Sequence, residues 1–213
     1  MPDDSSHHVA TEDDLRGLFA PPSDRVIRKQ LTKLDKYCRR FIELSPFVCL
    51  ATSDADGNAD VSPRGDAPGF VRVLDDRTLV IPDRRGNNRL DSLANIVSSP
   101  KVGLLFLVPG INETLRVNGT AKIVDDPEDL AAAEANGKRP TVAVVVTVTE
   151  AFLHCGKAMI RSKLWAEETQ VDRKVLPGLG RMVVEQIEGR ELDADEAKAA
   201  DDWVEDSYRT KLY

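Results

Sequence analysis

A ten-residue stretch in the second half of the chain constrains the fold most strongly, because it is the most β-branched part of the sequence. Residues 141–150 place valines at four alternate positions, and the residues between them are mostly Ala, Val or Thr. Side chains alternate between the two faces of a strand, so both faces of this segment are largely apolar. We expect a strand that is covered on both sides and continues to His154.

Five other segments have the composition of strands, and tight turns join several of them. The turns at 54–58 and 109–112 contain Gly, Asp and Asn residues, which tolerate positive φ. Because hairpin connections predominate, we expect a mainly β fold with peripheral helices, an antiparallel barrel instead of a doubly wound α/β sheet. These strands are expected over residues 47–52, 61–62, 78–81, 102–108 and 113–124.

Helical periodicity is confined to the segments around these strands. Apolar residues recur at helical spacing from residue 24 onwards and predict one amphipathic helix over 24–44. Residues 1–22 are polar and acidic, so we expect a loose N-terminal arm followed by a single domain over 23–213. Further helices are expected over 87–97, within 125–137 and over 194–213.

Charge and cysteine content narrow the classes of function. The 213 residues include 36 Asp or Glu and 29 Lys or Arg, and the net charge of −7 argues against nucleic acid and membranes as partners. The longest apolar runs are shorter than the roughly 20 residues that a membrane-spanning helix needs. Three widely spaced cysteines, and an acidic start in place of a secretory signal, favour a cytoplasmic protein.

The first candidate site is the sequence Arg-Arg-Gly-Asn-Asn-Arg at residues 84–89, between a predicted strand and a predicted helix. The free N–H groups of a helix start, together with three arginines, can bind a phosphate group. A basic loop whose asparagines cap the helix explains the same residues equally well. The segment matches neither the GxxxxGK[ST] phosphate loop nor the GxGxxG dinucleotide turn.

The second candidate lies at residues 60–66, at the end of a predicted strand. Strand alternation places Ser62 and Arg64 on the same side, and Pro63 favours a sheet edge, where backbone groups are free for a ligand. One Ser and one Arg can hold an anion. A surface turn with an ion pair between Arg64 and Asp66 is the alternative.

Two further segments mix polar and titratable side chains. Thr114, Arg116 and Asn118 project from one face of a strand, where they meet either a heteroaromatic ring or water. Residues 154–165 combine an imidazole, a thiol, several cations and an indole. His154 and Cys155 are adjacent and so face opposite sides of a strand, which argues against a cysteine hydrolase. The spacing of His and Cys predicts no metal site.

These segments, in this order, resemble the pyridoxamine 5'-phosphate oxidase-like family of FMN-binding split β-barrel proteins, and within it a branch of uncharacterised FMN-dependent enzymes. The resemblance runs from about Pro46 to Trp165. It rests on LATSDADGNADVSPRGD, LVIPDRRGNNRLDSLANI, PKVGLLFLVPG, ETLRVNG and HCGKAMIRSKLW.

The resemblance implies a homodimer that binds FMN between its two subunits. It implies phosphate contacts from Arg64, Asn87, Asn88 and Arg89, with Arg84 as an addition. Ser62, Pro63, Ile81, Pro82 and Asp83 would line the isoalloxazine through backbone groups. Thr114 would reach the flavin ring, with Arg116 on the same face, and Lys157, Ser162 and Trp165 would come from the partner subunit or the barrel rim.

The family further implies a flavin-dependent oxidoreductase whose small-molecule substrate is unknown and whose electron donor is NAD(P)H or a deazaflavin. Residues 180–213 form an acidic helical ending in place of the closing strand, with its Trp and Arg, of the vitamin-processing oxidases, which argues against pyridoxamine phosphate as the substrate. Two alternatives stay open: a non-catalytic flavin or haem binder, and a protein-interaction module that uses the basic face of residues 25–40.

Overall fold

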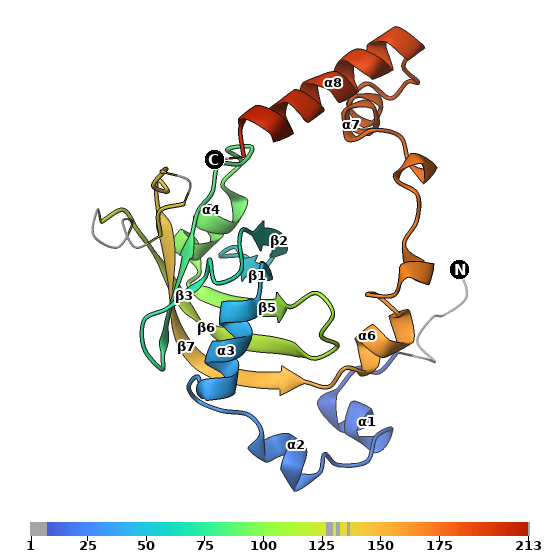
Figure 1. Cartoon of the computed structure of the whole chain (residues 1–213). Helices are drawn as coiled ribbons and strands as arrows, with labels where there is room; N and C mark the ends of the chain where they lie inside the picture. Colours follow the sequence, from blue (N-terminus) through green and yellow to red (C-terminus); the bar gives the residue numbers. More distant parts are fainter. Residues whose placement is uncertain (1–7, 127–129, 131–132, 136, 213) are drawn as a thin grey trace.

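Seven antiparallel strands form one strongly curled sheet (Figure 1). The computed structural model describes residues 8–126, 130, 133–135 and 137–212. The strand order is β2-β1-β5-β6-β7-β4-β3, so the described sheet has β2 and β3 as its edges. The predicted mainly β, antiparallel architecture is confirmed. The strands are β1 (Phe47–Ser53), β2 (Ala59–Gly65), β3 (Arg72–Val73), β4 (Thr78–Pro82), β5 (Lys101–Leu107), β6 (Thr114–Val124) and β7 (Ala143–His154).

The main apolar core lies on the inner face of this sheet. Alternate residues of the central strands are fully or almost fully buried there, and helices α3 (Lys36–Leu44) and α4 (Asp91–Ser98) add apolar side chains to it. Cys38 of α3 is one of them, and burial raises the pKa of its thiol to about 11, as expected for an unreactive core cysteine. The strand residues that are buried most completely include Val48, Leu50, Leu104, Phe106, Leu115, Val117, Val146 and Val148.

A bulge between Asn118 and Gly119 shifts the register of β6 against β7. A Cβ atom at position 119 would lie 2.1 Å from the carbonyl oxygen of Thr147, so this close approach of two backbones requires glycine.

The single helix expected over residues 24–44 is wrong, because two helices occupy this range: α2 (Asp24–Arg28) and α3. Between them, the N–H and C=O of Leu31 exchange hydrogen bonds of 2.9 and 2.8 Å with Ala151 of β7, beyond the part of β7 that pairs with β4. Asp35 then starts α3 by accepting hydrogen bonds from the N–H groups of Tyr37 and Cys38. Leu31 therefore pairs with β7 between the two helices, which prevents one continuous helix over this range.

Two other expected helices also differ from the structure. The helix expected over 87–97 begins at Asp91, because Asn88 and Leu90 adopt left-handed backbone angles (φ 59° and 62°). Much of the helix expected within 125–137 lies outside the described residues. Within the expected N-terminal arm, residues 1–7 also lie outside them, and a short helix, α1 (Glu12–Gly17), follows.

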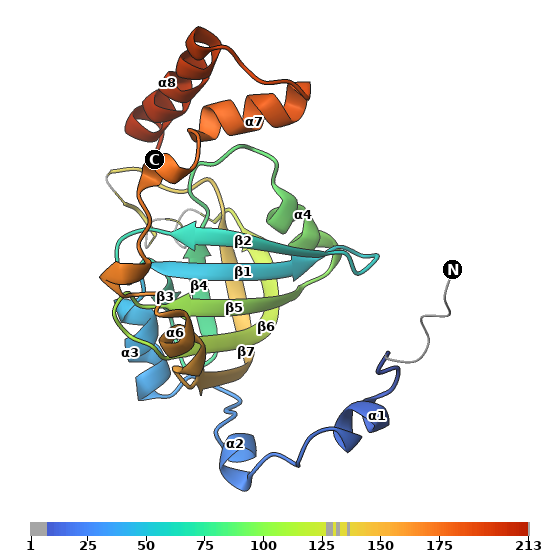
Figure 2. The ribbon, with the colours of Figure 1, turned by 90° about the vertical axis from the view of Figure 1, so that its right-hand side faces the viewer.

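The C-terminal part of the chain leaves the barrel after the short helix α6 (Lys157–Ser162) (Figure 2). Two 3₁₀ turns, Glu167–Thr169 and Arg173–Val175, lead to an α-hairpin of α7 (Leu179–Glu188) and α8 (Ala194–Thr210). The helices pack closely, because a Cβ at Gly180 would lie 2.1 Å from the carbonyl oxygen of Ala200. No helix among the described residues is long and apolar enough to cross a membrane.

Candidate functional site

One large pocket brings the first two candidate segments together. Its volume is about 1130 Å³, and it lies between β2, the loop that follows β4, and the start of α4. Of the fifteen site residues expected from the sequence, nine line it, and the buried Ile81 lies outside its described lining. The nine are Ser62, Pro63, Arg64, Pro82, Asp83, Arg84, Asn87, Asn88 and Arg89. Segments about 20 residues apart in the sequence thus form a single cavity.

Two crossed ion pairs join β2 to the loop after β4. The Nη1 atom of Arg64 lies 2.6 Å from Oδ1 of Asp83, and the Nε atom of Arg84 lies 2.7 Å from Oδ2 of Asp66. The ion pair between Arg64 and Asp66 that the sequence offered as an alternative is therefore wrong, since each residue pairs with a residue of the opposite segment. Both pairs are largely buried, so they fix the relative position of strand and loop.

The guanidinium of Arg64 has capacity for a further ligand. Its Nε atom is buried and makes no hydrogen bond to any described residue. An unsatisfied buried donor is costly, and it is satisfied when an acceptor binds beside it. In this pocket a phosphate oxygen is a suitable acceptor, because arginine binds phosphate with two parallel N–H donors.

The start of α4 adds backbone donors to the same cavity. None of the described side chains caps this helix, and its N-cap residue, Leu90, also lines the pocket. Asn87 accepts a hydrogen bond of 3.0 Å from the N–H of Arg89, so it orders the loop. The explanation of Asn87 and Asn88 as helix caps is thus wrong. The uncapped first turn leaves N–H groups and the positive end of the helix dipole for an anion.

Side-chain hydrogen bonds hold α4 against the sheet. Oδ2 of Asp60 accepts a hydrogen bond of 3.0 Å from the hydroxyl of Ser92, and the amide of Asn95 donates one of 3.0 Å to Thr52. Sequence reasoning did not single out Ser92 or Asn95, because their partners lie more than 30 residues away. It also missed Arg139, Thr141 and Leu212, which line the pocket from the β7 entry and from the chain's C-terminal end.

Thr114 and Arg116 lie outside the described lining of this pocket, in a second polar cluster on the other face of the sheet. Arg116 pairs with Glu150 at 2.7 Å, and its guanidinium lies 4.1 Å from the ring centre of Phe152. Asn118 donates a hydrogen bond of 3.2 Å to the same carboxylate. Register explains the grouping, since Thr114, Arg116 and Asn118 oppose His154, Phe152 and Glu150.

The two titratable groups at the end of β7 have shifted pKa values. Burial, with the positive charges of Arg116 and Lys29, lowers the pKa of His154 below its ordinary value of 6.5. A hydrogen bond from the backbone N–H of Lys157 lowers the pKa of the exposed Cys155 thiol. No described cluster of three or more His, Cys, Asp or Glu side chains has the arrangement of a metal site.

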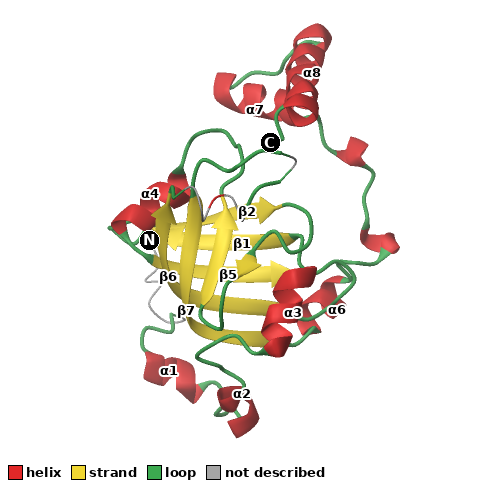
Figure 3. Ribbon diagram, turned by 60° about the vertical axis from the view of Figure 1, so that its left-hand side comes forward, coloured by secondary structure: helices red, strands yellow, loops and turns green. Residues whose placement is uncertain are grey.

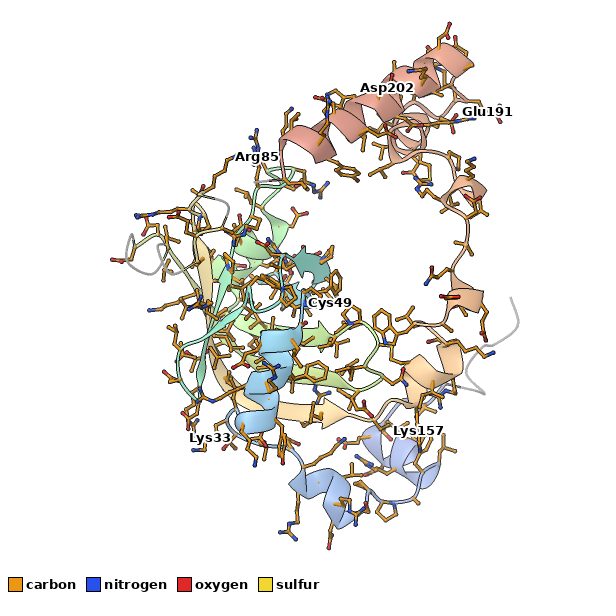
Figure 4. All side chains as sticks on the ribbon, in the orientation of Figure 1. Lys33, Cys49, Arg85, Lys157, Glu191 and Asp202 are labelled. Carbon is orange, nitrogen blue, oxygen red and sulfur yellow. The ribbon has the colours of Figure 1, made fainter. Side chains whose placement is uncertain are left out.

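The remaining expected site residues lie on α6 and just after it, outside the described lining of the pocket. The indole N–H of Trp165 donates to the carbonyl of Ile111 at 3.0 Å, and the Ser162 hydroxyl donates to the carbonyl of Met159. Figure 4 shows Lys157 on α6 well away from Arg85, which lines the pocket. The expectation that Lys157, Ser162 and Trp165 serve the flavin from a partner subunit or from the barrel rim stays a prediction.

Comparison with known proteins identifies the family. A family model described as pyridoxamine 5'-phosphate oxidase matches residues 34–155, which contain all seven strands and most of the pocket. The chain belongs to the pyridoxamine 5'-phosphate oxidase family. The α7–α8 hairpin lies beyond the residues that match this family model.

Several solved structures are similar to the chain over little more than half of its length. HupZ from Group A Streptococcus is 22% identical, and the similarity covers 56% of this chain and 93% of that one, with a TM-score of 0.46. A proposed pyridoxamine 5'-phosphate oxidase from Lactobacillus delbrueckii is 29% identical, and the similarity covers 58% of this chain and 98% of that one, with a TM-score of 0.45. An FMN-binding protein from Syntrophomonas wolfei is 13% identical, and the similarity covers 55% of this chain and 83% of that one, with a TM-score of 0.45. No curated protein matches the chain.

Proposed function

We propose that this protein is an oxidoreductase that binds FMN in the pocket between β2 and the start of α4. The observation that carries the proposal is the convergence of Arg64, the 84–89 loop and the uncapped first turn of α4 on one cavity. Membership of the pyridoxamine 5'-phosphate oxidase family supports flavin over other phosphorylated ligands. FMN would supply the two-electron chemistry, and the chain would supply binding and orientation.

The residues that would hold the phosphate are Arg64, Asn87, Asn88 and Arg89, with Arg84 beside them. Arg64 offers its unsatisfied Nε donor, and the uncapped first turn of α4 offers backbone N–H groups. The backbone of Ser62, Pro63, Ile81, Pro82 and Asp83 would lie along the isoalloxazine.

We further propose that two copies of the chain share the flavin. The outer face of the sheet carries apolar side chains that water can reach: Phe47 and Val61 are exposed, and Leu105 and Leu107 are only half-buried. A second copy that covers this face would remove them from water. It would also bring residues such as Thr114, Arg116 and Trp165 near the partner's flavin.

The cofactor is tested by an absorption spectrum of the purified protein and by mass analysis of any molecule that heat releases. A flavin spectrum with FMN released supports the proposal. Protein that is colourless and does not bind added FMN contradicts it. It would then favour the protein-interaction module.

The phosphate contacts are tested by replacing Asn88 and Arg89 together. Asn88→Gly keeps the left-handed backbone that alanine would strain, and Arg89→Ala removes the charge. We expect the Kd for FMN, measured by flavin fluorescence, to rise about tenfold because charge-assisted contacts are lost. Arg77→Ala, an exposed arginine in the turn before β4, is the matched control and should leave the Kd unchanged. Equal affinity of both variants would refute these contacts.

A non-catalytic flavin or haem binder is the second candidate, because of the pocket's chemistry. Of the described residues that line it, none is His, the side chain that most often transfers protons near neutral pH. A flavin enzyme does not need such a group, because the flavin supplies the redox chemistry, and a non-catalytic carrier does not need one either. Turnover of bound FMN with NAD(P)H or a deazaflavin donor favours the enzyme. A bound cofactor that no donor reduces favours the carrier.

A further inference from the structure

The α7–α8 hairpin carries an apolar stripe that its own chain leaves exposed. Leu179, Val183 and Ile187 recur every four residues along α7, and their exposed fractions are 41%, 41% and 79%. Trp203 on α8 is 70% exposed. The two helices pack mainly against each other, and a two-helix unit with this much apolar surface is a typical docking element.

The hairpin also carries an excess of negative charge. Residues 179–212 contain ten Asp or Glu and five Lys or Arg, for a net charge of −5. A surface that combines apolar side chains with excess negative charge fits a partner surface that combines apolar side chains with positive charge.

The same chain displays a surface of this kind on residues 24–40, which we name the basic segment. It contains seven Lys or Arg against two Asp, for a net charge of +5. Its apolar side chains Val26, Ile27 and Tyr37 are all more than half exposed. The basic segment and the hairpin therefore match in both charge and apolar character.

The two surfaces lie too far apart to meet within one chain. Figures 1, 2 and 3 all place α7 and α8 beyond one end of the barrel and α2 beyond the opposite end. A two-fold axis that reverses one copy against the other brings each hairpin to the partner's basic segment, and the contact then forms twice.

We propose that the acidic α7–α8 hairpin docks on the basic segment of a second copy of this chain. This interface goes beyond the proposed function, because the α7–α8 hairpin lies outside the family-matched residues, no residue of the basic segment lines the described pocket, and the contact needs no cofactor. It also gives the extended stretch between α6 and α7 a role, since that stretch would carry the hairpin across to the partner.

Two charge-reversal variants test the contact. The segment variant carries Arg25→Glu, Arg28→Glu and Lys36→Glu, and the hairpin variant carries Glu191→Lys, Asp202→Lys and Glu205→Lys, with Glu191 and Asp202 labelled in Figure 4. Each variant alone should raise the dimer dissociation constant at least about tenfold, measured by sedimentation without flavin, because like charges then face each other twice. Arg72→Glu, at an exposed position of the edge strand β3, is the control and should leave it unchanged.

Mixing the two variants decides between contacts within and between chains. In a mixed dimer, the unchanged hairpin meets the unchanged segment and the reversed hairpin meets the reversed segment, so association should return to the wild-type value. Thermal melting by circular dichroism confirms that each variant is folded. The proposal is overturned if the wild-type chain is monomeric, if neither variant weakens association, or if mixing restores nothing, as a contact within one chain would require. FMN binding, measured separately, reports on the flavin pocket alone.

Discussion

Arg64 and Arg116 are matched in chemistry and differ in surroundings. Each pairs with a carboxylate at 2.6 or 2.7 Å, and each has a buried Nε atom without a hydrogen-bond partner among the described residues. They lie on opposite faces of one sheet. Arg64 points toward a cavity beside an uncapped helix start, whereas Arg116 is stacked on Phe152 and held by Glu150. An ion-paired arginine is thus no evidence for an anion site until its surroundings offer room and further donors.

The largest expected effect separates the two arginines by the ligand's phosphate. Arg64→Ala should raise the Kd for FMN about 100-fold, because a forked donor is lost and Asp83 is left as an unpaired negative charge in the pocket. The Kd for riboflavin, which lacks the phosphate, should change much less. Arg116→Met should not alter the ratio of the two affinities. Fluorescence titrations with both ligands measure this ratio.

An Arg64→Lys variant sharpens the same comparison. Lysine keeps the charge but cannot form two parallel hydrogen bonds, so its FMN affinity should fall between those of wild type and Arg64→Ala. Equal loss of riboflavin and FMN affinity in Arg64→Ala would assign Arg64 to folding of the pocket and would contradict its role at the phosphate.

A smaller effect, of opposite sign, is expected at Asp83. Its carboxylate accepts a hydrogen bond of 2.6 Å from Nη1 of Arg64, so a phosphate must compete with it for this guanidinium. Asp83→Asn keeps the shape of the side chain and removes the charge, and it should lower the Kd for FMN about fivefold, because the phosphate then no longer competes with a carboxylate for Arg64. Glu150→Gln, the matched change beside Arg116, should leave the ratio of FMN to riboflavin affinity unchanged. Weaker binding by Asp83→Asn would show that Asp83 orients Arg64 for the ligand instead of competing with it.

The comparison also shows which structural features of this molecule can be predicted from residues that are close in the sequence. The strands follow from alternation and turn residues, so their order along the chain and the antiparallel fold were predictable. The break between α2 and α3 was not, because the partner of Leu31 is Ala151, 120 residues away. Residues 84–89 were recognisable from the local sequence as a basic loop at a helix start. The crossed pairing of Arg64 with Asp83 and of Arg84 with Asp66 was not predictable, because it depends on how two separate segments meet in space.

The α7–α8 hairpin illustrates a different limit. Periodicity predicted a helix over 194–213, and the structure has one at Ala194–Thr210. The Gly178-Leu179-Gly180 sequence resembles a turn, yet it begins α7, and Gly180 allows the backbones of α7 and α8 to approach. A helix's own pattern shows which face is apolar, but it does not show what that face contacts.

The smallest expected effect concerns His154, which lies on the Arg116 side of the sheet. Burial is the first cause of its lowered pKa, and the charges of Arg116 and Lys29 add to it. Because the folded state holds the proton less tightly than the unfolded state, the unfolded chain binds more protons just below the ordinary histidine pKa of about 6.5. The contribution of His154 to stability is therefore complete above that pH and is lost as the pH falls through the lowered pKa.

Two variants isolate this contribution. Arg116→Met should raise the pKa of His154 by removing one positive charge, and an NMR titration of the imidazole, assigned by the loss of its signal in His154→Gln, measures the change. His154→Gln should lose less stability than wild type when the pH is lowered from 7 through 6, as denaturant unfolding at each pH would show. Arg64→Ala, on the opposite face of the sheet, is the control and should leave the His154 titration unchanged. A His154 pKa that does not respond to Arg116→Met would show that burial alone sets it, and that Arg116 acts on this face only through its contacts with Glu150 and Phe152.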